Sequence, residues 1–164
     1  MHPLAKVEIL LWYNNNKSRF INKKIADLGS FNINGTVKDF IPGVIGFDIL
    51  TGKNVDVVIV PGNIPVEHQN KYGLIITTSA LQCCPDSLIF KREIIDLLEP
   101  NGEVFVTMCN KTCNYKHSTS PNSYDFQDGI RMNSNDIVTF FYPEFNVISV
   151  KESGTDLFYH GKMM

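Results

Sequence analysis

Several classes of protein are excluded by what this chain of 164 residues lacks. Its 4 cysteines do not suggest a disulfide framework, so we expect a reducing, cytoplasmic location. No stretch reaches the ~18 apolar residues of a membrane span, and the apolar residues 7–13 are interrupted by Glu8. A basic start followed by a small-residue cleavage site is also missing, so we expect neither a secretory signal nor a membrane partner.

An excess of charge of one sign is missing as well. The chain has 15 basic and 17 acidic residues, with a net charge of −2 and a pI near 6.1. This balance gives no bulk attraction to nucleic acid, and the lysines around residues 17–24 are interpreted as a solvated patch. An apolar content of 43% in a chain of this length predicts one domain, residues 1–164, with a real core.

Short apolar runs alternate with helical patterns along most of the chain. The runs predict strands over 24–28, 44–48, 55–60, 74–78, 103–108, 147–150 and 157–159. Helical spacing predicts a helix over 3–13, within an N-terminal helical segment of residues 1–22, and helices over 87–98 and from Ser134 to about 141. This alternation predicts an α/β sandwich around a mainly parallel sheet.

Two of these helices come with more detailed expectations. Asp86 or Ser87 is expected to cap the helix over 87–98, and Ser134 the last one. The buried side of the helix over 87–98 is expected to carry Leu88, Ile89, Ile94, Ile95, Leu97 and Leu98.

The first strand leads into the most informative part of the sequence. It is followed by a turn with Gly29 and Gly35, which allow close approach of backbone to a ligand. The next strand ends in Asp48, 21 positions after Asp27. A strand, a glycine-bearing turn and a second strand tipped by a carboxylate are the layout of a nucleoside-cofactor site, because the acid can accept hydrogen bonds from both ribose hydroxyls.

The order of these motifs resembles the class I S-adenosylmethionine (SAM)-dependent methyltransferases, in particular the small free-standing methyltransferase-domain group. The resemblance covers residues 22–150 and rests on Asp27-Leu-Gly-Ser, Gly46-Phe-Asp48, Pro61-Gly-Asn63, the strand 73–78 and the turn Leu97–Gly102. It implies a Rossmann-like three-layer sandwich with a seven-stranded sheet of order 3-2-1-4-5-7-6, in which strand 7 is antiparallel, and SAM as the cofactor. Phe31 stands where the commoner form of the first turn has its second glycine.

The resemblance assigns the methionine end of the cofactor to the turn after the first strand. Asp27 would lie near the amino group, and the backbone at Gly29 would lie against the cofactor. Ser30 and Asn34, beside Gly35, would hydrogen-bond the carboxylate or the backbone. Each residue also has a purely structural interpretation, namely a turn-capping Asp27, a sharp turn at Gly29 and a turn dipeptide at Asn34-Gly35.

The nucleoside end of the cofactor is assigned to the next strand ends. Asp48 would grip the ribose hydroxyls, and Ile49 would cover one face of the adenine. Asn63 matches a position that contacts the adenine amino group in the family, with a loop-capping asparagine as the alternative. Thr78 and Ser79 follow the strand at which methyl donor and acceptor meet in this family.

Candidate catalytic residues lie in a long polar segment, residues 109–133, interpreted as a substrate or lid loop. The resembling group has a His/Tyr/Asp-rich loop here, matched by His117, Tyr124, Asp125 and Arg131. We expect His117 to deprotonate the acceptor, with a solvated loop histidine as the alternative. Asp125 and Arg131 are expected to take part in the site or to form an ion pair that closes the lid.

Other reactive residues are given structural interpretations. The segment Ser79-Ala-Leu-Gln-Cys83 lacks the acids and the histidine that many relatives have here, so it offers no general base. Cys83-Cys84-Pro85 reverses the Pro-Cys pair of cytosine-C5 methyltransferases and is interpreted as structural. Cys109, Cys113 and His117 lack a fourth ligand, so no metal site is predicted.

The sequence thus predicts an enzyme that transfers a methyl group from SAM to an oxygen or nitrogen atom of a small-molecule, sugar or other acceptor. The main alternative is a non-catalytic SAM-fold binding or interaction module. A nicotinamide-dependent reductase is disfavoured because Phe31 would crowd a pyrophosphate. No Asn-Pro-Pro-Tyr-like tetrapeptide is present, which speaks against methylation of DNA bases.

Overall fold

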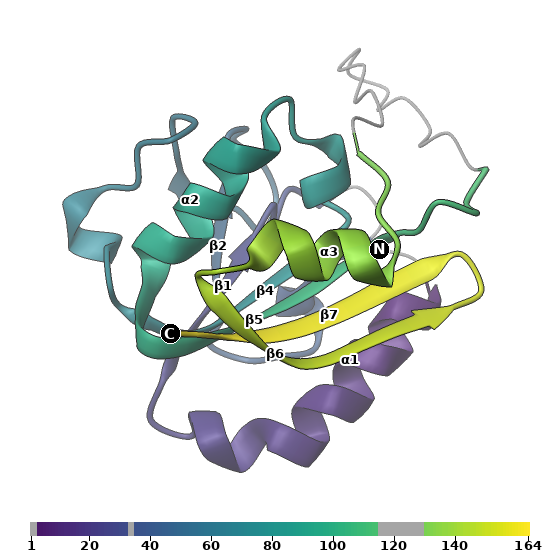
Figure 1. Cartoon of the computed structure of the whole chain (residues 1–164). Helices are drawn as coiled ribbons and strands as arrows, with labels where there is room; N and C mark the ends of the chain where they lie inside the picture. Colours follow the sequence, from purple (N-terminus) through teal and green to yellow (C-terminus); the bar gives the residue numbers. More distant parts are fainter. Residues whose placement is uncertain (1–2, 33–34, 115–129) are drawn as a thin grey trace.

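A computed structural model describes residues 3–32, 35–114 and 130–164, which form a seven-stranded sheet between helical layers (Figure 1). The strands are β1 (Lys24–Leu28), β2 (Ile45–Asp48), β3 (Val57–Val58), β4 (Tyr72–Thr78), β5 (Leu98–Cys109), β6 (Phe145–Ser153) and β7 (Asp156–Met163). Their order is β3-β2-β1-β4-β5-β7-β6. All neighbours are parallel except β7, which is antiparallel to both β5 and β6. The predicted architecture is confirmed.

Helices cover both faces of this sheet. The α-helices are α1 (Pro3–Asn16), α2 (Ser87–Leu97) and α3 (Ser134–Phe141), and the short 3-10 turns are η1 (Lys17–Phe20), η2 (Val37–Asp39), η3 (Val66–His68) and η4 (Leu81–Cys83). In Figure 1, α1 lies on one side of the sheet, and α2 and α3 lie on the other. Within the described residues, no helix is long and apolar enough to cross a membrane.

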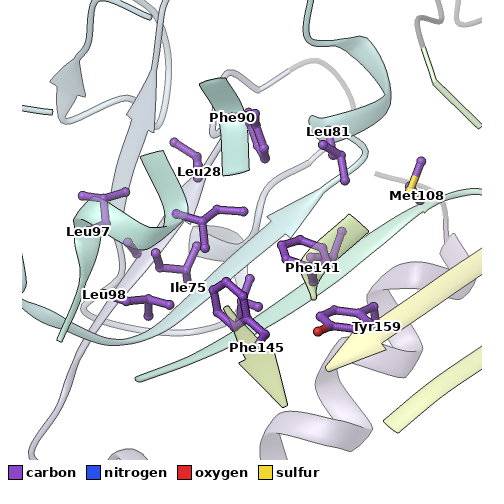
Figure 2. Close-up of a cluster of buried hydrophobic side chains, with 14 of the residues drawn as sticks. Leu28, Ile75, Leu81, Phe90, Leu97, Leu98, Met108, Phe141, Phe145 and Tyr159 are labelled. Carbon is purple, nitrogen blue, oxygen red and sulfur yellow. The ribbon is translucent and has the colours of Figure 1, made fainter. Parts of the chain in front are cut away.

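The core is divided between the two faces. Ile9 of α1 packs on the face that contains Ile76 and Phe105. The opposite face contains Ile75 and Tyr159 and packs against α2 and α3, and Figure 2 shows this cluster. Because β4 is buried on both faces, its central residues Leu74–Ile76 are all apolar, as expected for a central parallel strand.

Some elements differ from the sequence prediction. The strand predicted over 55–60 contains only Val57 and Val58, because it pairs with β2 alone at the sheet edge. Strand β5 begins at Leu98, which pairs with Tyr72 before an irregularity around Asn101 at φ +62°. Part of the turn expected at Leu97–Gly102 is therefore an irregularity within β5.

The helix predictions need two corrections. Leu88 and Ile89 are exposed (66% and 37%), because α2 turns Phe90, Glu93, Ile94 and Leu97 toward the sheet. The α3 helix is capped by Asn133 rather than Ser134, since the Asn133 side chain accepts the Asp136 amide at 2.9 Å. Asp86 caps α2 as expected, accepting amides of Leu88 and Ile89.

Candidate functional site

The parallel register places the carboxyl ends of β1, β2 and β4 side by side at one end of the strands, here called the edge of the sheet. Asp27 is opposite Gly46 of β2 on one side and Ile76 of β4 on the other. Asp48, the last residue of β2, and Ser79, which follows β4, therefore extend past the same edge. In open α/β sheets, ligands bind beyond this edge.

Asp48 is half-buried and held by two backbone amides. Its Oδ2 accepts from the Phe31 amide at 2.9 Å, and its Oδ1 accepts from the Leu50 amide at 3.0 Å. Burial raises the pKa of the Asp48 carboxyl, although these hydrogen bonds pull it down. Each carboxylate oxygen has a further acceptor direction, so the group is oriented by the protein and can still accept hydrogen bonds from a ligand.

Asp27 is fully buried and only partly satisfied. Its Oδ2 accepts from the Val37 amide at 3.2 Å, whereas its Oδ1 has no hydrogen-bond partner. Burial raises the pKa of Asp27 to about 7, and the nearby charge of Asp48 adds to the shift. A buried carboxyl group with an unpaired oxygen is costly, and such groups mark functional sites.

Close packing explains why position 29 is a glycine. Its φ is +86°, its amide donates to the Phe47 carbonyl at 2.8 Å, and a Cβ here would lie 2.2 Å from the Ala80 Cβ. The turn after β1 therefore lies directly against the segment after β4, and only glycine fits between them. The structural interpretation of Gly29 is thus supported by its contacts, whatever it also does for a ligand.

The neighbouring turn residues have different surroundings. The Ser30 hydroxyl is buried without a hydrogen-bond partner, beside the backbone of Gly46. Gly35 has φ +95°, and its amide donates to the Asn32 side chain at 2.8 Å. Asn34, the remaining predicted residue of this turn, lies outside the described residues.

The residues predicted to meet the base and the methyl group lie at or just past the strand ends. Ile49 is 45% exposed, and Asn63 is exposed in a turn closed by its own amide, which donates to Val60 at 2.9 Å. Thr78 ends β4 and is half-buried. Ser79 follows at φ +58°, a backbone conformation that is rare outside glycine and tends to occur at functional sites.

Comparison with known proteins bears on the fold. No protein-family model matches the chain, and neither does any curated protein. Solved structures do match. A SAM-dependent methyltransferase from Anabaena variabilis has a TM-score of 0.66 at 14% identity, and the match covers 95% of this chain and 84% of that one. Another from Thermotoga maritima has a TM-score of 0.66 at 10% identity, and the match covers 94% of each chain. A third, from Aquifex aeolicus, has a TM-score of 0.60 at 13% identity, and the match covers 87% of this chain and 82% of that one. The chain has the class I methyltransferase fold.

Sequence reasoning missed one acidic residue, which lies beside the turn after β3. Glu93 of α2 is buried, and its Oε1 accepts from the Gly62 amide at 2.8 Å. Its pKa is raised by burial and further by the charges of Asp96 and Asp48. The signal was present in the sequence, since Glu93 lies four residues after Ile89 and four before Leu97, both of which were predicted for the buried side of the helix.

The predicted catalytic loop is described only at its two ends. His117, Tyr124 and Asp125 lie outside the described residues, and Arg131 is half-buried at the returning end. There, Asn110 forms a parallel bridge with Met132. The Asn110 side chain also donates to Glu152 Oε2 at 3.2 Å and to the Gly154 carbonyl at 3.0 Å. Both ends of the loop are therefore fixed beside the end of β5.

Two partly buried cysteines near these strand ends, Cys84 and Cys109, have a raised pKa. The Cys84 Sγ donates to the Leu81 carbonyl at 3.0 Å, and burial raises the pKa of this thiol to about 12. Burial and a hydrogen bond with Cys113 raise the pKa of Cys109 to about 11. Thiols with a raised pKa are poor nucleophiles at neutral pH. Among the described residues, no three His, Cys, Asp or Glu side chains are grouped to hold a metal ion.

Two cavities lie at the opposite end of the sheet, near the beginning of β1. The larger is about 380 Å³ and is bordered by Tyr13, Phe20, Lys23 and Pro42. The smaller, about 220 Å³, shares Phe20 and Lys23 with it and is bordered by the Lys23–Glu99 ion pair. Neither cavity includes the carboxylates at the ends of β1 and β2. The candidate site is therefore identified from the chemistry of its side chains and not from a cavity.

Proposed function

We propose that this protein binds SAM beyond the ends of β1, β2 and β4 and transfers the methyl group to an oxygen or nitrogen atom of a small-molecule or sugar-like acceptor. The observation that carries the proposal is the pair Asp27 and Asp48. Asp27 is fully buried with an unpaired Oδ1, and Asp48 lies close enough for its charge to raise the pKa of Asp27. Two acids in this environment favour a cationic ligand that also carries hydroxyl groups.

The described residues fit the parts of this cofactor. The unpaired Oδ1 of Asp27 suits the ammonium of the methionine portion, and the remaining acceptor directions of Asp48 suit two ribose hydroxyls. The exposed side chains of Ile49 and Asn63 are available to a base, one through apolar contact and the other through hydrogen bonds. When bound, SAM supplies an electrophilic methyl group on a sulfonium.

The contribution of the chain itself would be orientation and exclusion of water. Methyl transfer from a sulfonium is an in-line displacement, for which positioning and desolvation supply much of the rate enhancement. Residues 79–83 contain no acid or histidine, so proton removal from the acceptor is assigned to His117. Tyr124, Asp125 and Arg131 are assigned to the acceptor side of the site.

Calorimetric titration with the product S-adenosylhomocysteine (SAH) tests the proposal directly. We expect one-to-one binding by the parent protein and affinity at least roughly tenfold weaker in Asp48→Ala, because charge-assisted hydrogen bonds are lost. Glu67→Ala, which removes an exposed acid in η3, is the matched control and should bind like the parent. An absence of heat with the parent would overturn the proposal.

A second candidate function is a non-catalytic SAM-fold module, favoured by the absence of an acid or histidine from residues 79–83. The two functions differ in turnover. A methyltransferase transfers labelled methyl groups from SAM to an acceptor pool, and His117→Ala should abolish the transfer while SAH still binds. A binding module would bind SAH in the same way and label no acceptor.

A further inference from the structure

Glu93 is a buried acid whose position on α2 has no local explanation. Its side chain is 4% exposed and shares the sheet-facing side of the helix with Phe90, Ile94 and Leu97. A carboxylate in such surroundings loses its hydration, which disfavours its presence unless a partner compensates. The compensating partner is 31 positions away in the sequence, at Gly62.

The contact joins the helix to the turn that follows β3. Glu93 Oε1 accepts from the Gly62 amide at 2.8 Å, and Gly62 has φ +76° in the turn closed by the Asn63-to-Val60 hydrogen bond. Ile89, one helical turn before Glu93, lies next to the same glycine, since a Cβ on Gly62 would be 3.5 Å from Ile89 Cγ2. Thus α2 contacts this turn at two successive helical positions.

This turn belongs to the nucleoside end of the candidate site. Its last residue, Asn63, is exposed, and so is Val60 (66%). Asp48 pairs with Val58, and the Ile59 amide donates to the Asp48 carbonyl at 2.9 Å, so the turn begins beside the end of β2. Because Glu93 is buried and its carboxylate contacts Gly62, its effect on a ligand must pass through the turn.

We propose that Glu93 is a positioning residue for base recognition: its hydrogen bond to Gly62 fixes the Pro61–Asn63 turn against α2 and thereby sets the Asn63 side chain toward a purine nucleoside. This inference rests on the proposed function. It requires an acceptor atom at position 93 rather than a charge. Glutamine, whose amide oxygen can accept from Gly62, should therefore replace glutamate, whereas leucine of similar size should not.

The main experiment measures SAH affinity by calorimetry in Glu93→Gln, Glu93→Leu, Asn63→Ala and the double variant Glu93→Leu/Asn63→Ala. We expect Glu93→Gln to bind within about twofold of the parent and Glu93→Leu to bind roughly five- to tenfold more weakly. In the Asn63→Ala background, Glu93→Leu should add less than about twofold, because both changes remove the same contact.

A selectivity measurement separates positioning from general loosening of the fold. The ratio of the affinities for SAH and S-inosylhomocysteine, which differ at the base, should fall in Glu93→Leu and Asn63→Ala alike. Ile94→Val, which removes a methyl group from the buried face of the same helix, should leave the ratio unchanged. If Glu93→Leu does not fold, Glu93→Ala takes its place in both measurements.

Amide hydrogen exchange at Gly62 gives a readout without any ligand. Exchange should be slow in the parent and in Glu93→Gln, and at least roughly tenfold faster in Glu93→Leu. Unchanged SAH affinity in Glu93→Leu, or losses that add fully in the double variant, would overturn this inference while leaving the proposed function intact. A parent protein that does not bind SAH would overturn both.

Discussion

The backbone amide of Phe31 donates a 2.9 Å hydrogen bond to Asp48 Oδ2 and so ties the turn after β1 to the end of β2. The Phe31 side chain reinforces this link, because its ring packs on Gly52, where a Cβ would lie 2.4 Å from the ring. The residue that replaces a glycine of the commoner methyltransferase pattern therefore joins the two loops. Its ring lies on the loop after β2, beside the proposed ribose site.

Asp48 should contribute to stability as well as to binding. Asp48→Ala leaves the Phe31 and Leu50 amides without their acceptor, so we expect a loss of ~1–2 kcal/mol in the free energy of unfolding. Asp48→Asn keeps one acceptor oxygen and should lose less. Urea denaturation of both variants measures the difference, and equal stability of the alanine and asparagine variants would contradict it.

Asp27 should make stability depend on pH. The pKa of Asp27 in the folded protein is about 7, against an ordinary value of 3.8, so the folded state binds this proton more tightly than the unfolded state. The contribution of Asp27 to stability therefore falls as the pH rises from about 4 to about 7 and is constant above that. An asparagine side chain at this position does not ionise, so Asp27→Asn should gain ~2–4 kcal/mol over the parent across this window.

The measurement is urea unfolding of the parent and of Asp27→Asn at several pH values between 4 and 8. The difference between the two proteins isolates this residue from the other carboxyl groups. A difference that does not change with pH would show that Asp27 is ionised in the folded protein. Under the proposed function, Asp27→Asn should also weaken SAH binding even though it stabilises the fold.

Two glycines with positive φ allow a matched test of close packing. In Gly29→Ala the new Cβ would meet Ala80 Cβ at 2.2 Å, whereas in Gly43→Ala (φ +75°) nothing lies within 4 Å. We expect Gly43→Ala to cost ~1 kcal/mol from the backbone conformation alone and Gly29→Ala to cost at least ~3 kcal/mol. The double variant Gly29→Ala/Ala80→Gly should recover part of that loss, and no recovery would contradict the contact.

A buried network should make Glu103 far more important than its neighbour Glu99. Trp12 Nε1 donates to His160 Nδ1 at 3.2 Å, so the proton of His160 is on Nε2, which donates to Glu103 at 2.7 Å. Arg19 also pairs with Glu103. Glu103→Ala leaves the buried His160 without its acceptor and removes the partner of the half-exposed Arg19, so it should cost ~3 kcal/mol.

Glu99→Ala is the matched control for this prediction. Glu99 pairs with Lys23 near the surface, where the side chains are 26% and 46% exposed, so its removal should cost less than ~1 kcal/mol. Thermal or urea unfolding of the two variants measures the difference. Similar losses in both would show that the His160 network does not hold α1 to the sheet.

The sheet was predictable from local patterns. The strands 24–28 and 74–78 are short apolar runs bounded by polar or glycine residues, and their bounds agree with β1 and β4 to within two residues. The weakly patterned edge strand was predicted too long, because the length of β3 depends on its pairing with β2. Ser134 and Asn133 are both suitable caps, and only the path of the chain selects Asn133.

The sequence by itself determined the alternation of strands and helices and the placement of Asp27, Gly29 and Asp48 at strand ends, because hydrophobic period and turn residues are local properties of the chain. Only the tertiary structure decided that Asp27 is fully buried with one oxygen unpaired, and that Glu93 on α2 holds the Gly62 turn. Burial and hydrogen-bond partners depend on which segments pack together across long sequence separations, and no local pattern contains that information.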